Sequence, residues 1–356
     1  MLNKKDNITV EYWGELDGDS IYLYTMKNDN GMEVSITNYG GIIRSIKVPN
    51  NEKELIDVVL GFDTLEEYLD EHPYFGAIIG RFGNRIANAR FKLNNQEYHL
   101  LANDGKNHLH GGAKGFDSYV WGAKAIKSGV DTSLILSHLS RDGEEAYPAN
   151  LDIKVIYTLT NDNEIIINYQ AISDEDTIIN LTNHSYFNLN GMEDNVLNHD
   201  VQLNSTLYTA TDEELIPTGA ILPVADTPLD FRESKKIGEE IDSDFKPLLY
   251  GGGYDHNFVL NANGDVSLAA SVFEESTSIM MEVYTDQPGI QLYTGNSLGE
   301  IKGKDNKVYT KNYGLCLETQ HFPDSINHSH FPSVVLEAGE LYDTTTIYKF
   351  SNKENK

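Results

Sequence analysis

Apolar and polar residues alternate along much of this 356-residue chain, and this two-residue period constrains the fold more than any other feature. Residues 151–160, LDIKVIYTLT, alternate, residues 161–163 are the turn-forming triplet NDN, and residues 164–172, EIIINYQAI, alternate again. Alternation puts every second side chain on the same face of a strand, so that one face can be buried while the other meets water. The pattern predicts an antiparallel hairpin.

Other segments carry the same signal. Residues 89–101, ARFKLNNQEYHLL, predict a second hairpin that turns at Asn94 and Asn95. Further strands are expected at residues 132–140, 278–286, 290–296 and 345–350. Helical signals are few, and the best is residues 63–72, where Thr64 and Glu67 form a plausible capping box.

Many short strands at steady spacing with few helices are typical of a β-sandwich or barrel. No internal repeat of about 20–50 residues is visible, which disfavours a propeller. The hydrophobic fraction of 40% is enough for a large core. We therefore predict an all-β fold in one domain, residues 1–350, followed by a polar tail, residues 351–356.

Charge limits the possible partners. The chain has 55 acidic and 27 basic residues, a net charge of -28. Nucleic acids and anionic lipids require Lys and Arg to displace their counterions, so neither is an expected partner. The single cysteine, Cys316, lies between two leucines and is expected to pack as a small apolar residue. With no internal disulfide possible and no apolar leader or membrane span in the sequence, we expect a cytoplasmic protein.

Two polar residues have unusual neighbours in the sequence. His184 lies in the stretch TNHSYFNLNG, residues 182–191, where asparagines surround two aromatic residues. It is either a core histidine or one wall of a site for a polar ligand. Glu318 lies in YGLCLETQ, and in a strand it would share a face with Cys316. It is either a solvated residue at a strand end or a partly buried carboxylate with a raised pKa, suited to general base catalysis.

Other candidates each have a simpler interpretation. Asp255 follows three glycines and could be an ordinary turn residue, and Arg85 in GNRIANAR could be a surface arginine. Neither glycine-rich segment has the spacing of a nucleotide-binding loop. His108 and His110 would face the same way if extended, and the chain repeats this spacing at residues 328–330. Without HExxH or a cysteine pair, zinc is a weak hypothesis.

Taken together, several motifs resemble those of the galactose mutarotase, or aldose 1-epimerase, family. They occur in one order over about residues 10 to 350, and they are GRFGNRI, NHLHGG, TNHSYFNL, DHNF, VYTDQPGIQLYTGN and CLETQHFPDSINH. Each motif is weak alone, but six in order make the match specific. The resemblance implies a large, mostly antiparallel β-sandwich (a supersandwich), and an enzyme without metal or cofactor.

The resemblance also implies roles for individual residues. Glu318 matches the family's general base, His184 its general acid, and His110 a residue that supports the acid near the ring oxygen of the sugar. Four more positions match sugar-binding residues: Asn84, Arg85, Asp255 and Gln291. The expected partner is a small aldose such as galactose or glucose, and the expected assembly is a monomer or homodimer. The polar stretch around His184 would then serve to aim its imidazole.

Three other functions remain open from the sequence. A glycoside hydrolase would use two carboxylates, for instance Asp255 and Glu318. A sugar-binding module would need no acid–base pair, so Glu318 and His184 together disfavour it. A hexose-phosphate epimerase would need more basic residues than Arg85 among the motifs, so free hexoses are preferred.

Overall fold

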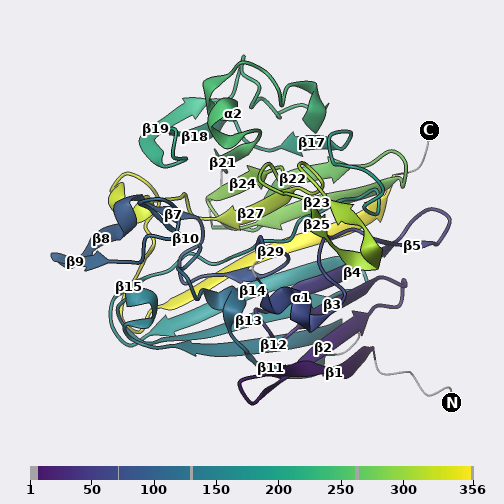
Figure 1. Cartoon of the computed structure of the whole chain (residues 1–356), viewed down its shortest axis with the longest axis horizontal. Helices are drawn as coiled ribbons and strands as arrows, with labels where there is room; N and C mark the ends of the chain where they lie inside the picture. The colour runs from purple at the N-terminus through teal and green to yellow at the C-terminus, as the bar shows by residue number, and fades with distance from the viewer. Residues whose placement is uncertain (1–6, 71, 129–130, 261–263, 354–356) are drawn as a thin grey trace.

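Antiparallel sheets are the main regular structure of the protein, whose computed structural model describes residues 7–70, 72–128, 131–260 and 264–353. The largest sheet has nine strands and runs through the middle of the molecule (Figure 1). Its order is β11 (Gly122–Ser128), β12 (Asp131–Ser140), β13 (Leu151–Leu159), β14 (Glu164–Ser173), β29 (Leu341–Asn352), β23 (Ile279–Thr285), β22 (Ser267–Phe273), β17 (Asp200–Leu203) and β20 (Lys235–Lys236).

Two five-stranded sheets accompany the large one. The first is a meander of β1 (Ile8–Leu16), β2 (Asp19–Lys27), β3 (Glu33–Thr37), β4 (Ile43–Pro49) and β5 (Leu55–Asp57). The second has the order β19 (Pro217–Pro223), β18 (Leu207–Thr211), β21 (Asp255–Val259), β24 (Gly289–Tyr293) and β27 (Cys316–Gln320). The hydroxyl of Tyr157 on β13 donates to the carbonyl of Gly41 beside the first sheet at 2.9 Å. The hydroxyl of Tyr348 on β29 donates to the carbonyl of Leu317 in the second at 3.2 Å. The large sheet therefore packs against both.

Short elements connect these sheets. The paired strands are β6 (Ile78–Ile79) with β16 (Thr182–Asn183), β7 (Arg85–Ile86) with β10 (His108–Leu109), β8 (Arg90–Leu93) with β9 (Gln96–His99), β15 (Thr177–Ile178) with β28 (Val335–Leu336), and β25 (Ile301–Lys302) with β26 (Val308–Tyr309). The helices are α1 (Leu65–Leu69) and α2 (Lys246–Gly251), with 3-10 turns at Ala87–Ala89, Phe116–Ser118, Glu144–Ala146, Ile237–Glu239, Lys304–Asn306 and Ser325–Asn327. Among the described residues no helix is long and apolar enough to cross a membrane.

The predicted alternation is visible in the burial of the central strands. On β13 every odd-numbered residue from Leu151 to Leu159 is buried, and on β14 so are Ile165, Ile167 and Tyr169. These side chains form one apolar cluster with residues of both smaller sheets. Each large apolar side chain contributes about 1.5–3 kcal/mol when it is fully buried. The prediction of a mostly antiparallel all-β sandwich is confirmed.

Local sequence signals are confirmed as well. The hairpin at residues 89–101 turns at Asn94 and Asn95, whose φ angles of 49° and 65° are those of a type I′ turn. Helix α1 begins after Thr64, and the Glu67 carboxylate accepts the Thr64 backbone N–H at 3.0 Å, as a capping box requires. The helix is shorter than predicted because its C-cap, Asp70, is already extended.

The predicted end of the last strand was wrong. We expected a strand over residues 345–350 and a polar tail from residue 351, whereas β29 covers Leu341–Asn352. Ser351 and Asn352 pair with Met280 and Ile279 of β23. Backbone pairing in a ladder needs no apolar side chain, so hydrophobicity alone underestimates the length of the strand. Residues 354–356 lie outside the described part of the chain.

Replacing Ile167 with alanine should lower the free energy of unfolding by about 2–5 kcal/mol, because the side chain is fully buried on β14 and leaves a cavity. Ile172→Ala on the same strand is the matched control, since Ile172 is 48% exposed and should change stability by less than about 0.5 kcal/mol. Urea unfolding followed by fluorescence measures both. Equal losses in the two variants would contradict this assignment of the core face.

Candidate active site

Six of the seven predicted site residues line one pocket of about 350 Å³. Glu318 comes from β27 and Asp255 from β21, neighbours of β24 in one sheet. Arg85 begins β7, and Asn84, His110 and His184 lie beside short strands. The pocket therefore has a rigid floor of paired strands and a wall of irregular segments.

The seventh residue, Gln291, does not line this pocket. It lies on β24 directly opposite Glu318 and is 3% exposed. Its Nε2 donates to the Asp255 carboxylate Oδ1 at 2.6 Å. In the structure Gln291 therefore orients the carboxylate of a pocket residue, Asp255, from the neighbouring strand.

His110 and Asn84 hold each other through the backbone. Both adopt left-handed conformations, with φ angles of 52° and 64°. The His110 N–H donates to the Asn84 carbonyl at 3.1 Å, and the Asn84 N–H donates to His110 Nδ1 at 3.2 Å. Because Nδ1 accepts this bond, the proton of the neutral imidazole resides on Nε2.

His184 is held by the stretch that the sequence singled out. Its N–H donates to the Ala77 carbonyl at 2.9 Å, and its own carbonyl accepts the Gly76 N–H at 3.1 Å. The Asn183 amide donates to the Gly76 carbonyl at 2.9 Å. The Tyr186 ring stacks on the imidazole with 5.0 Å between the ring centroids. The polar residues of this stretch thus fix the backbone that aims His184.

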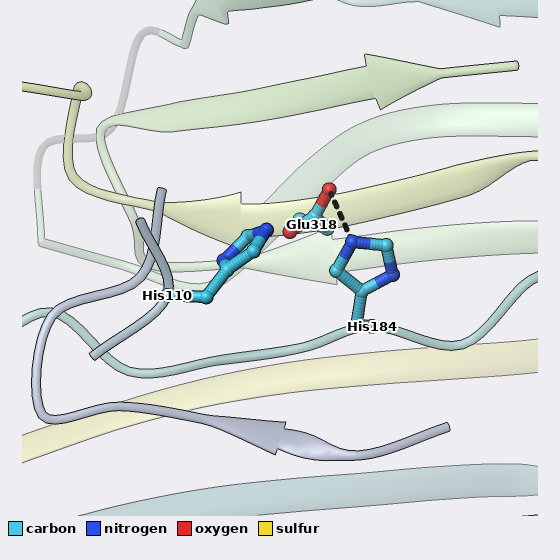
Figure 2. A group of neighbouring side chains, drawn as sticks. All are labelled: His110, His184 and Glu318. Carbon is cyan, nitrogen blue, oxygen red and sulfur yellow. Dashed lines mark ion pairs between the residues drawn. The ribbon is translucent and has the colours of Figure 1, made fainter. Parts of the chain in front are cut away.

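His184 and Glu318 face each other in the pocket, as Figure 2 shows. His184 Nε2 lies 3.8 Å from Glu318 Oε1, and the two residues are 4% and 2% exposed. His110 completes the group, with one ligand-type atom from each of the three residues within 4.8 Å of the others. A sugar hydroxyl or ring oxygen placed here could reach both a carboxylate and an imidazole.

Arg85 contacts two carboxylates that line the same pocket. Arg85 Nε donates to Asp104 Oδ2 at 2.8 Å, and Arg85 Nη1 lies 3.9 Å from Asp255 Oδ2. Neither Arg85 nor Asp255 is the solvated surface or turn residue of the simpler interpretation. Asp104 was missed by the sequence interpretation, although its Asn-Asp-Gly turn ends one residue before NHLHGG.

Aromatic residues form part of the wall. Tyr74, Tyr186 and Tyr293 line the pocket, whereas Phe187 is fully buried and packs on Tyr348. The Tyr74 ring lies 4.8 Å from that of His110 and 5.8 Å from that of His184. Tyr74 and Tyr293 were not predicted, because nothing in their local sequence indicates these long-range contacts.

Burial dominates the electrostatics of the site. It raises the pKa of Glu318 well above its ordinary value, and the nearby Asp255 carboxylate raises it further, while Arg85 opposes both. Burial lowers the pKa of His184 to about 4. It also lowers the pKa of His110, and the neighbouring His184 and Arg85 lower that pKa further. The 3.8 Å separation is too long for a strong ion pair, so one proton on Glu318 beside a neutral His184 is favoured.

The hydrogen bonds of His110 disfavour a metal ion in this group. A histidine that binds a metal through one nitrogen usually donates the N–H of the other to a carbonyl or carboxylate. His110 Nδ1 instead faces a backbone N–H, which leaves Nε2 protonated and without a lone pair for a metal.

His108 does not lie beside His110 in the site. Its ring nitrogens contact the Leu101 carbonyl and the Tyr147 hydroxyl, and the left-handed turn at His110 ends the extended strand. His328 and His330 contact the carbonyls of Pro217 and Gly219.

The fold and the pocket define an all-β protein with a buried acid–base pair. The comparisons give its family. A family model described as aldose 1-epimerase matches residues 22–349, so the chain belongs to the aldose 1-epimerase family. It is 43% identical to galactose mutarotase from Homo sapiens over 349 residues, covering 97% of this chain and 99% of that protein. It is 37% identical to aldose 1-epimerase from Escherichia coli over 339 residues, covering 94% and 96%.

A solved structure agrees with these relatives. The crystal structure of galactose 1-epimerase from Lactobacillus acidophilus matches with a TM-score of 0.86 and 29% identity, covering 98% of this chain and 99% of that one. The resemblance seen in the motifs, and the fold that it implied, are therefore both confirmed.

Glu318→Gln should make the protein more stable than the wild type as pH rises above about 4.5. The unfolded chain loses the Glu318 proton near that pH, whereas the folded state retains it to a higher pH, so the carboxyl costs the folded state stability over this interval. Thermal unfolding at several pH values measures the difference in Tm. The exposed Glu52→Gln is the control and should follow the wild type. A pH-independent difference for Glu318→Gln would contradict the raised pKa.

Proposed function

We propose that this protein is an aldose 1-epimerase (mutarotase), an isomerase that interconverts the α and β anomers of free hexoses such as galactose and glucose. The observation that carries the proposal is the buried pair of Glu318 Oε1 and His184 Nε2, 3.8 Å apart in a polar pocket. The human relative bears the name galactose mutarotase, and the E. coli relative bears the name aldose 1-epimerase.

Glu318 is the general base and His184 the general acid in this proposal. Glu318 removes the proton from the C1 hydroxyl while His184 gives a proton to the ring oxygen O5. The C1–O5 bond breaks and leaves an open-chain aldehyde, which rotates about C1–C2. The ring then closes on the other face of the carbonyl, O5–H returns its proton to His184, and Glu318 returns its proton to the new C1 hydroxyl. No proton is lost and nothing is oxidised or reduced.

The pKa values of the pair suit this exchange. Ring opening takes the pair from carboxylate and imidazolium to carboxylic acid and neutral imidazole, and closure reverses the change. Both states hold one proton, so the pair keeps its total charge throughout. Burial favours the uncharged state and hence the product of ring opening. Sugar oxygens that hydrogen-bond to the charged groups would bring the two states closer in free energy.

The remaining predicted residues hold the sugar. His110 presents Nε2–H to the region of the ring oxygen, because its Nδ1 is occupied by the Asn84 N–H. Arg85 and Asp255 offer a donor and an acceptor to neighbouring hydroxyls, and Asn84 adds an amide. Gln291 acts through Asp255, whose carboxylate it fixes. Such positioning is a second source of rate enhancement beside acid–base catalysis.

The charges of the pocket favour free sugars over hexose phosphates. Among the described residues that line the pocket, the one basic side chain of the Arg or Lys type is that of Arg85. Three lining residues carry carboxyl groups: Asp104, Asp255 and Glu318. A phosphate would need several basic partners in place of these acids.

We also propose one domain, because the nine-stranded sheet draws its strands from between Gly122 and Asn352 and shares its core with the N-terminal sheet. Cytoplasmic location and assembly as a monomer or homodimer remain predictions.

Glu318→Gln and His184→Asn should each lower kcat by at least about 100-fold, the usual contribution of one acid or base. Polarimetry of fresh α-D-galactose and α-D-glucose, corrected for the spontaneous reaction, measures this and ranks the two sugars. Both variants should still bind sugar, and EDTA should leave the wild-type rate unchanged. Near-normal turnover in either variant would remove that residue from its role, and release of sugar from a glycoside would favour a hydrolase.

Asp255→Asn should shift the alkaline limb of the kcat–pH profile to lower pH. The Asp255 charge raises the pKa of Glu318, and its removal also leaves Arg85 to lower that pKa. Since the active pair needs one proton, the rate falls when that proton is lost at high pH. It also falls at low pH, when His184 gains a second proton near its pKa of about 4. An unshifted alkaline limb would contradict this coupling, whereas a higher KM would agree with the binding role of Asp255.

A further inference from the structure

We propose that Asp104 is a positioning residue for sugar binding, whose carboxylate holds the Arg85 guanidinium by Nε and keeps Arg85 from closing onto Asp255. The donors of Arg85 and the acceptor of Asp255 then both remain open to sugar hydroxyls. The proposal rests on the proposed function, in which Arg85 and Asp255 bind the sugar. Neither the sequence motifs nor the family resemblance assigned a role to Asp104.

Arg85 has two carboxylates beside it but makes a hydrogen bond to one of them. Its Nε donates to Asp104 Oδ2 at 2.8 Å, whereas its Nη1 lies 3.9 Å from Asp255 Oδ2, beyond hydrogen-bond distance. Among the described residues, no other nitrogen of the Arg85 side chain donates a hydrogen bond to the protein. A guanidinium has one donor on Nε and four on its Nη atoms, so the Nη donors stay available to a ligand in the pocket.

Without Asp104, the gap between Arg85 and Asp255 should close. The two side chains have opposite charges, and each is 14% exposed. Coulombic attraction is stronger in such a partly desolvated site than at the surface, so the pair favours a direct, charge-assisted hydrogen bond. That bond would occupy a donor and an acceptor that the sugar needs. Asp104 holds the guanidinium at its Nε edge and opposes this movement.

The backbone fixes the position of Asp104. Arg85 begins β7 and pairs with Leu109 of β10. The chain enters β10 from a turn in which Asp104 and Asn107 exchange backbone hydrogen bonds, at 3.0 Å from the Asp104 N–H and 2.9 Å from the Asn107 N–H. Asn107 is 3% exposed, and its side-chain oxygen accepts the Asn88 N–H at 2.9 Å. Both partners of the contact are therefore fixed to one pair of strands and its turn.

The Asp104 carboxylate has one hydrogen-bond partner in the described part of the chain, which is Arg85. The turn itself is held by backbone hydrogen bonds and by Asn107. Shortening the Asp104 side chain should therefore leave the turn in place and release Arg85. Glu214 supplies a matched control, because its side chain is 40% exposed against 36% for Asp104, and it pairs with Lys106 at 2.9 Å instead of with Arg85.

The test compares Asp104→Ala with Glu214→Ala. We expect Asp104→Ala to raise KM for galactose and glucose about two- to fivefold, the effect of one partly exposed ion pair, with kcat unchanged. Asp104→Asn keeps an acceptor without the charge and should lie between Asp104→Ala and the wild type. Glu214→Ala should keep the wild-type KM. In Arg85→Met, which lacks the guanidinium, Asp104→Ala should cause no further loss of kcat/KM, because Asp104 acts through Arg85.

Nitrogen-15 NMR of labelled arginine tests the contact without turnover. The Arg85 Nε–H should be protected from exchange with water in the wild type and should lose this protection in Asp104→Ala. NMR titration with D-galactose should show the same weakening of binding as KM does. An unchanged Kd and KM in Asp104→Ala would overturn the proposal, and so would an equal loss in Glu214→Ala or a full further loss in the Arg85→Met background. A protein that binds galactose in this Asp104-dependent way but does not accelerate mutarotation would contradict the proposed function alone.

Discussion

The Glu318 carboxyl is buried, and the rest of the site has to compensate for the cost of that burial. Moving an ionised carboxylate out of water is costly unless it is paired or protonated. Glu318 is 2% exposed, and its Oε2 has no hydrogen-bond partner among the described residues. The group tolerates this place because it can share a proton with His184. The strand that carries it is buried along its whole length and paired with β24, so its backbone cannot relax towards solvent.

The sheets and the irregular segments contribute in different ways. The paired strands fix Asp255, Gln291 and Glu318 on one face, at spacings set by the ladder. The loops contribute hydrogen-bond donors such as Asn84 and His110. Both residues have the left-handed backbone conformation, which regular strands do not contain. Proton-transfer groups therefore stand on a rigid element or are tied to one by backbone hydrogen bonds, which suits a reaction that depends on atomic positions.

The sequence predicted what depends on local pattern. Alternation over residues 151–172 determines which side chains are buried, and the Asn94–Asn95 turn needs only its own two residues. The motifs also identified six pocket residues. The arrangement of the site was less predictable: Gln291 contacts the Asp255 carboxylate and does not line the pocket, and the left-handed turn at His110 separates it from His108. Contacts between distant segments, such as Tyr74 with both imidazoles, leave no local signal.

The place of β29 has a consequence for synthesis of the protein on the ribosome. This strand lies between β14 and β23 in the middle of the large sheet (Figure 1). During translation β14 is synthesised long before its partner β29. The edge of β14 that will pair with β29 is therefore unpaired while the strands of the second five-stranded sheet are synthesised. An unpaired edge of apolar strands invites association with other chains. The nascent chain is therefore exposed to association with other chains until β29 is made and joins the two halves of the sheet.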